Sequence, residues 1–248
     1  MKRITLLALV LSLALTVPTL VFAQTGATAV PDHIHLTWTG SPATTMTVNW
    51  RTDAAIKAGV VEYAKGTQLT ARSRRIAASA SEFPTDLGTT RVFEATLTGL
   101  APDTQYCYRV GDGSSNWSTT HTFTTAPATT DKVEFLIFGD SQSIATGDSP
   151  YSEWSTTVHN AYKANPTAKF IVNVGDLVDV GQNGAHWNAW FKGAEGVIDA
   201  IPEMPVVGNH ETTPAKLPRR PSYWTAQFAL PTNGPDAWKE QAYSYDYG

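Results

Sequence analysis

Three short apolar segments of this chain each end in a glycine followed by an aspartate or an asparagine. Residues 133–138 lead into GD at 139–140, residues 170–174 lead into GDLVD at 175–179, and residues 204–207 lead into GNHE at 208–211. Apolar runs of this length, bounded by turn residues, are typical of buried parallel strands. We therefore expect three such strands, each ending in a polar turn.

The intervals between these segments have helical periodicity. Apolar side chains recur at helical spacing over residues 151–163 and again over residues 185–198, where Trp187, Trp190 and Phe191 fall on one face. Alternation of strand and helix is the pattern of βαβ units, which build a parallel sheet with right-handed crossovers. The second half of the chain is thus predicted to be an α/β layer.

The three polar turns are expected to meet, because ligands of open α/β sheets bind outside the carboxyl ends of the strands. The side chains brought together would be those of Asp140, Asp176, Asn209 and His210. Carboxylates, an amide oxygen and an imidazole suit a hard metal ion better than they suit a protein core. A single Gly-Asp pair is also ordinary turn chemistry, so the hypothesis of a metal site depends on all three motifs occurring in order.

The first half of the chain has a different pattern, with short alternating strands and frequent turns from about residue 30 to residue 127. Regularly spaced strands of this kind predict a β-sandwich. Residues 97–106 resemble the fibronectin type III segment in which a tyrosine at a strand start hydrogen-bonds back to its corner, and Tyr106 would be that tyrosine. Cys107 follows it and is the only cysteine, so no internal disulfide is possible and a packed core residue is expected.

Residues 1–23 have the features of a cleaved export signal. Lys2 and Arg3 precede a long apolar stretch, and small residues precede Gln24. We therefore expect a secreted or periplasmic protein with no membrane span after cleavage. The net charge is -4 and no basic run occurs, so the sequence offers no electrostatic support for binding nucleic acid or an anionic membrane.

The motifs GDSQ at 139–142, GDLVD at 175–179 and GNHE at 208–211 resemble the first three motifs of the calcineurin-like metallophosphoesterases. The preceding sandwich, including HLTWTG at 35–40, resembles the N-terminal domain of the purple acid phosphatases. The resemblance implies two domains: an all-β, fibronectin type III-like sandwich over residues 30–127, and the N-terminal part of an α/β metallophosphoesterase domain over residues 131–248.

The resemblance also implies roles for individual residues. Asp140 would bind a first metal ion, Asp176 would bridge two metal ions, and Asn209 would bind the second ion through its amide oxygen. His210 would face the phosphate of a small phosphoester substrate, and Glu211 would orient His210 or its loop. The implied activity is that of an exported phosphoester hydrolase, first of all for phosphomonoesters, which uses a hydroxide held between two metal ions.

Two positions depart from the family pattern. Purple acid phosphatases place a tyrosine three residues after the bridging aspartate, and here that position is Asp179. Many other members place a histidine two residues after the first aspartate, and here that position is Gln142. Gln142 could bind the first metal ion through its carbonyl oxygen, or Asp179 could do so, and Fe, Mn, Zn and Ca all remain open as the metal.

The family draws further ligands from two later histidine motifs, and the sequence ends before either of them. We therefore expect this chain to be the N-terminal part of a longer enzyme, with little activity of its own. The alternative is a chain whose β-sandwich acts as a binding or adhesion module beside an inactive catalytic half. Physiological substrate and oligomeric state are left open by the sequence.

The first prediction concerns colour. With Asp179 in place of the iron-binding tyrosine, the full-length protein loaded with iron should lack the visible phenolate-to-iron absorption band. The visible spectrum of the iron-loaded protein tests this. A preparation with that band would show that another tyrosine binds the iron and that the ligand interpretation is wrong.

Overall fold

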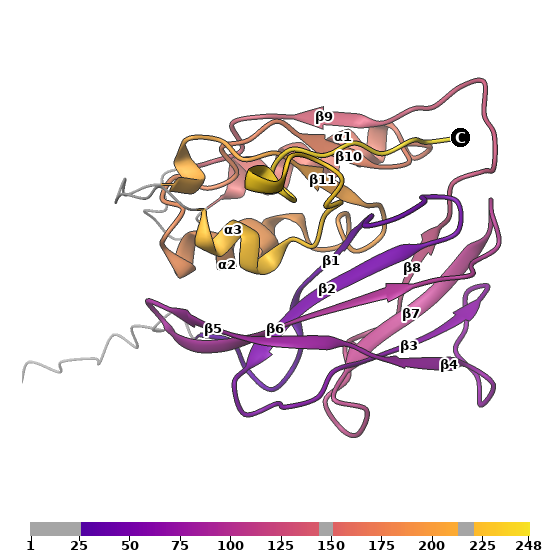
Figure 1. Ribbon diagram of the computed structural model, residues 1–248, viewed down its shortest axis with the longest axis horizontal. Coiled ribbons are helices and arrows are strands. Elements are labelled where there is room, and N and C mark those ends of the chain that lie inside the picture. The colour runs from indigo at the N-terminus through magenta and orange to yellow at the C-terminus, as the bar shows by residue number, and fades with distance from the viewer. Residues whose placement is uncertain (1–25, 144–150, 213–220) are drawn as a thin grey trace, which may run out of the picture.

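The structure is a computed structural model that describes residues 26–143, 151–212 and 221–248. A two-sheet antiparallel sandwich comes first and a smaller parallel sheet with its helices packs on top of it (Figure 1). The expected export signal, residues 1–23, lies outside the described residues. No helix of the described residues is long and apolar enough to cross a membrane.

Each sheet of the sandwich has four strands. The first has the order β1-β2-β6-β5 and is formed by β1 (Asp32–Thr37), β2 (Met46–Asp53), β6 (Gly88–Leu97) and β5 (Ser79–Thr85). The second has the order β4-β3-β7-β8 and is formed by β4 (Arg74–Ala77), β3 (Val60–Lys65), β7 (Gln105–Gly111) and β8 (His121–Thr124). All pairings within both sheets are antiparallel.

The predicted corner tyrosine and packed cysteine are both confirmed. The Tyr106 hydroxyl accepts a hydrogen bond from the backbone N–H of Ala101 at 2.9 Å, which closes the corner between β6 and β7. Cys107 is fully buried in β7, and its thiol lies 3.6 Å from the Ala64 carbonyl oxygen.

The parallel sheet has the predicted strand–helix–strand–helix–strand order. Its elements are β9 (Leu136–Phe138), α1 (Ser152–Ala164), β10 (Ile171–Asn173), α2 (Gly184–Ala194) and β11 (Glu203–Pro205). The strands are arranged β11-β10-β9, and both pairings are parallel. The helix predicted over residues 185–198 ends at Ala194, because Gly196 has a φ of 90°, a conformation that terminates helices.

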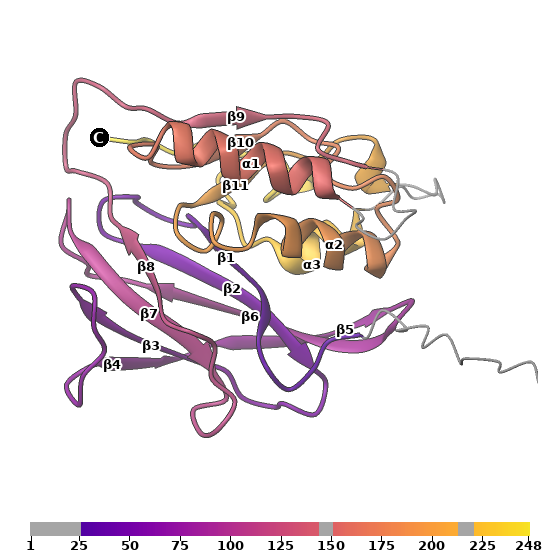
Figure 2. The ribbon, with the colours of Figure 1, turned by 180° about the vertical axis from the view of Figure 1, so that it is seen from behind.

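The expectation of buried strands is confirmed for β11, whose three residues are all buried, but is wrong for β9. Leu136 and Phe138 point toward α1, where the ring of Phe138 lies 5.3 Å from that of Trp154. The intervening Ile137 is 62% exposed, because side chains alternate across a strand and the described helices α1 and α2 pack together in front of the sheet (Figure 2).

The tail of the chain differs from expectation as well. After α3 (Ser222–Gln227) and a short turn of 3₁₀-helix (Asp236–Trp238), tyrosines alternate at 243, 245 and 247, a pattern typical of a strand. No strand forms there among the described residues. The rings of Tyr245 and Tyr247 instead contact the ring of Trp38, at centroid distances of 5.5 and 5.8 Å. This segment is therefore held by aromatic packing and not by the hydrogen bonds of a β-sheet.

The outer face of the first sandwich sheet is covered over β1 and β2 by α2, α3 and the segment after α2. The Leu36 N–H donates to the Ile198 carbonyl at 2.9 Å, and the Thr37 hydroxyl donates to the Ala229 carbonyl at 2.6 Å. The ring of His33 stacks on Phe191 at 4.2 Å, and burial lowers the pKa of His33 to about 3. Strand β2 is therefore buried on both faces, which explains its continuous run of buried residues.

Glu203 is an unusual member of this core. It is fully buried in β11, and neither carboxylate oxygen has a hydrogen-bond partner among the described residues. Burial without a partner disfavours the charged form and raises the pKa of Glu203 from its ordinary value of 4.5 to about 8. The folded protein should thus hold this carboxyl protonated at neutral pH.

The second prediction follows from this shift. Between about pH 4.5 and pH 8 the folded state keeps a proton on Glu203 that the unfolded state releases, so stability falls as the pH rises. Glu203→Gln imitates the protonated acid at every pH. The variant should match the wild type at pH 4 and gain up to about 1.4 kcal/mol per pH unit above it. Urea unfolding at several pH values measures this, and equal stabilities at pH 8 would contradict it.

Candidate metal centre

The register of the parallel sheet brings the three polar turns to one edge. Asn173, the last residue of the central strand β10, pairs with Phe138 on one side and with Pro205 on the other. Asp140 lies two residues after the end of β9, Asp176 lies three residues after the end of β10, and Asn209 lies four residues after the end of β11. All the residues predicted to form the site are therefore delivered to the same edge, as parallel strands require.

The two aspartates have the same unusual backbone conformation. Asp140 has a φ of 52° and Asp176 a φ of 55°, in the left-handed region that residues with side chains rarely adopt. Backbone of this kind persists where surrounding contacts hold it, and it is concentrated at functional sites. Here the two turns hold each other, because the Asp140 N–H donates to the Gly175 carbonyl at 3.1 Å and the Gln142 N–H donates to the Asp176 carbonyl at 3.0 Å.

The third turn packs directly on the Asp176 carboxylate. A Cβ atom at Gly208 would lie 2.1 Å from Asp176 Oδ1, so only glycine fits at this point of the GNHE motif. The same Oδ1 accepts the backbone N–H of His210 at 2.9 Å. Asn209 lies between these two contacts and is therefore held beside the carboxylate.

Glu211 organises the site without facing it. Its side chain is completely buried, and its two oxygens accept four backbone N–H groups. The donors are those of Asp176 at 3.0 Å, Leu177 at 2.8 Å, Val178 at 3.4 Å and Gly208 at 2.6 Å. Burial raises the pKa of Glu211, and the four N–H groups act in the opposite direction. The expectation that Glu211 orients its loop is thus confirmed.

His210 is held by the loop that follows Asp176. Its Nδ1 lies 2.6 Å from the Asp179 carbonyl oxygen and 3.5 Å from the carboxylate of the same residue. The bond to the carbonyl raises the pKa of His210, and the charges of Asp176 and Asp179 act in the same direction. Because Nδ1 donates to the carbonyl, Nε2 is the ring atom whose protonation changes.

Gln142 joins the first two turns. With its amide oriented to satisfy both groups, the side-chain nitrogen donates to the Asp176 carbonyl at 2.7 Å and to the Asp140 carbonyl at 3.2 Å. The amide oxygen is then the only part of this side chain left to act as a metal ligand. His186 lies behind the loop, where its Nδ1 accepts the Val180 N–H at 3.2 Å, which is a structural role.

The donors at this edge fit a hard metal ion. Asp140, Asp176 and Asn209 offer carboxylate and amide oxygens, the ligands that hard divalent cations take. Within the described part of the chain, no group of three or more His, Cys, Asp or Glu side chains could hold a metal ion. The amide oxygens of Asn209 and Gln142 are therefore needed to complete any set of protein ligands from these residues.

The sandwich contributes a support that the sequence did not suggest. Asp86, in the turn between β5 and β6, accepts the N–H of Gly184 at 2.8 Å and the hydroxyl of Tyr223 at 2.7 Å. Gly184 begins α2, directly after the loop that holds His210. The same loop is also bonded to the turn after β11, because the Gln182 side-chain amide donates a hydrogen bond to the Glu211 carbonyl at 3.1 Å. Nothing local in the sequence marks Asp86, because its partners are far away along the chain.

Two family models match this chain. The purple acid phosphatase N-terminal domain matches residues 31–125, and the calcineurin-like phosphoesterase domain matches residues 133–246. The fold and the motif-bearing strand ends agree with a metallophosphoesterase domain behind a sandwich. The chain belongs to the purple acid phosphatase-like members of the calcineurin-like phosphoesterase family.

Relatives and a solved structure agree with this assignment. An uncharacterised protein of Mycobacterium tuberculosis is 28% identical over 86% of this chain and 43% of its own length. Acid phosphatase type 7 of Mus musculus is 28% identical over 91% of this chain and 48% of its own length. The structure of a purple acid phosphatase from yellow lupin seeds shares the fold, with a TM-score of 0.69 and 19% identity over 89% of this chain and 43% of that one. The chain thus spans less than half the length of these relatives.

The third prediction concerns Glu211. Replacing it by alanine leaves four buried backbone N–H groups without their acceptor, and each such group costs about 1–3 kcal/mol when unsatisfied. Glu211→Ala should lower the free energy of unfolding by at least about 3 kcal/mol in urea titrations. Glu153→Ala, at an exposed glutamate in α1, is the control and should change it little. Equal unfolding midpoints for the two variants would show that the four hydrogen bonds to Glu211 do not stabilise the fold.

Proposed function

We propose that this chain supplies the first part of the active site of an exported, metal-dependent phosphoester hydrolase acting first of all on small phosphomonoesters. The observation that carries the proposal is the meeting of Asp140, Asp176, Asn209 and His210 at one sheet edge, with two of them in left-handed backbone conformations. Export is supported by residues 1–23 of the sequence. We also propose the boundaries 30–127 for the sandwich domain and 131–248 for the phosphoesterase domain.

The roles follow from position and chemistry. Asp176 follows the central strand, between the turns of Asp140 and Asn209, so its carboxylate would be the ligand that two cations share. Asp140 and, through its amide oxygen, Gln142 would hold one metal ion, and Asn209 would hold the other. Two metal ions bound there would polarise the phosphoryl group and lower the pKa of a bound water molecule.

His210 would act on the substrate rather than on the metal. Its Nδ1 is committed to the Asp179 carbonyl, which fixes the ring orientation. Its raised pKa favours a protonated ring that can donate a hydrogen bond to a phosphate oxygen or a proton to the leaving group. Mildly acidic solution favours this form, in keeping with an acid phosphatase.

The fourth prediction separates these roles in the full-length protein. Asp176→Asn should lose both metal ions, because a neutral amide cannot bridge two cations. His210→Ala should keep both ions and lose about 10²–10⁴-fold in turnover of p-nitrophenyl phosphate, the range for a general acid. Metal analysis beside steady-state kinetics measures both quantities.

The matched control for His210→Ala is His159→Ala, at an exposed histidine on α1. It should change neither metal content nor turnover. If His210→Ala empties the site, or if Asp176→Asn keeps both ions, the assignment of roles is wrong.

A further inference from the structure

Tyr151 combines two features that are unusual for a residue beside the candidate centre. It is the N-cap residue of α1, and its side chain is nevertheless completely buried. Its backbone has a φ of 63°, in the left-handed region that a bulky residue rarely adopts. Backbone of this kind persists only where the surrounding contacts hold it. The contacts of the Tyr151 side chain therefore indicate which part of the molecule requires this conformation.

The hydroxyl of Tyr151 contacts the loop that follows Asp176. It accepts the backbone N–H of Asp179 at 3.0 Å, and it lies 3.4 Å from Nδ1 of His186. The same Nδ1 accepts the backbone N–H of Val180 at 3.2 Å, so this atom has a lone pair and the proton of the ring is on Nε2. In the contact with His186 the Tyr151 hydroxyl is consequently the donor.

Both side chains keep the protonation that these contacts require. Burial raises the pKa of Tyr151 to about 12, although the backbone N–H groups of Asp179 and Ser143 act in the opposite direction. Burial lowers the pKa of His186. The phenol and the imidazole are therefore both uncharged near neutral pH.

The backbone held by Tyr151 and His186 is also the backbone that orients His210. The Nδ1–H of His210 donates to the Asp179 carbonyl at 2.6 Å, and the peptide group of that carbonyl carries the N–H of Val180. Asp179 is thus bonded to Tyr151 through its N–H and to His210 through its carbonyl. One short piece of backbone connects a buried tyrosine with the imidazole that we propose to act on the phosphate.

We propose that Tyr151 is a positioning residue for His210, because its hydroxyl, together with His186, fixes the peptide groups of Asp179 that set the orientation and the tautomer of the His210 ring. A neutral imidazole can carry its proton on either nitrogen, and a bond to a carbonyl selects the Nδ1–H form. The inference rests on the proposed function for its consequence in turnover, but not for the geometry of the ring.

The tautomers of the two histidines test this geometry directly in the metal-free full-length protein. Long-range ¹H–¹⁵N spectra of histidine-labelled protein at alkaline pH should show the Nδ1–H form for His210 and the Nε2–H form for His186. His210→Ala and His186→Asn assign the signals. Tyr151→Phe removes the hydroxyl and keeps the ring, and it should convert the His210 signals to those of mixed tautomers. An unchanged His210 tautomer in this variant would overturn the proposal, as would an Nδ1–H form of His186 in the wild type.

Turnover of p-nitrophenyl phosphate by the metal-loaded full-length protein tests the consequence for catalysis. Tyr151→Phe should lower kcat about 10- to 10²-fold with the same number of bound metal ions, because a small displacement of a catalytic group has effects of this size. In the His210→Ala background the same substitution should have no further effect, since no ring remains to be positioned. An equal loss of kcat in both backgrounds would contradict the proposal, because a merely structural role lowers turnover in either one.

The two proposals can fail separately. If His210→Ala by itself leaves turnover unchanged, the proposed role of His210 is wrong, and the tautomer spectra still decide whether Tyr151 positions the ring.

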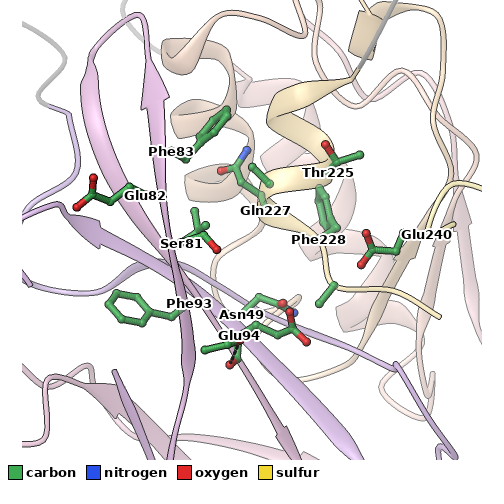
Figure 3. A pocket seen from close by; sticks show the side chains of 14 residues that line it. Asn49, Ser81, Glu82, Phe83, Phe93, Glu94, Thr225, Gln227, Phe228 and Glu240 are labelled. Carbon is green, nitrogen blue, oxygen red and sulfur yellow. Dashed lines mark hydrogen bonds between the residues drawn. The ribbon is translucent and has the colours of Figure 1, made fainter. Parts of the chain in front are cut away.

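Tyr162→Phe and Phe93→Leu are the matched controls. Tyr162 lies on α1, and its hydroxyl forms no hydrogen bond within the described residues. Phe93 lies on β6 of the sandwich, at the cavity between that domain and α3 (Figure 3), and its ring stacks on that of Trp50 at 5.1 Å. Phe93→Leu should therefore lower stability in the other domain and leave the His210 signals and kcat unchanged. Mixed His210 tautomers in Phe93→Leu would overturn the specific role of Tyr151, since loss of stability alone would then release the ring.

Discussion

The candidate centre depends on one buried carboxylate that is not itself a ligand. Glu211 gathers four backbone N–H groups from the turns after β10 and β11, and thereby fixes the positions of Asp176 and Gly208 relative to each other. Backbone donors at a turn have no partner in the sheet and need an acceptor. A single side chain supplies it, so the spacing of the site residues is set by a residue behind them.

The sandwich also helps to fix the positions of the site residues. Strand β2 of its first sheet is buried on both faces, and Asp86 at the turn between β5 and β6 accepts hydrogen bonds from the first residue of α2 and from the hydroxyl of Tyr223. The loop that orients His210 ends at that helix start. Displacing a catalytic group by about 1 Å can reduce a rate about 10²-fold, so a support of this kind bears on function.

Three carboxylates in this structure show how surroundings decide the role of the same group. Glu211 is buried but accepts four N–H groups, and it is structural. Glu203 is buried with no partner among the described residues, so its protonated form is favoured. Glu94 is exposed on the sandwich surface, and partial burial together with the charge of Glu240 raises its pKa. Desolvation and available donors, rather than residue type, separate the three cases.

Much of the architecture was predictable because it is encoded locally. Hydrophobic periodicity predicted the order of strands and helices, turn residues predicted where Asp140, Asp176 and Asn209 leave their strands, and Tyr106 marked its own corner. Strand and helix limits and the exposure of Ile137 were not predictable, because they depend on which face the neighbouring elements cover.

The sequence by itself determined the fold class and the residues of the candidate centre, since each motif lies within a few residues of its strand end. Only the tertiary structure decided which groups support that centre and which remain unpaired. Asp86 lies 98 residues from Gly184 along the chain, and Glu203 is left without a partner among the described residues by the elements that bury it. Contacts of this kind arise from the packing of the two domains, and no local pattern of residues records the orientation in which domains pack.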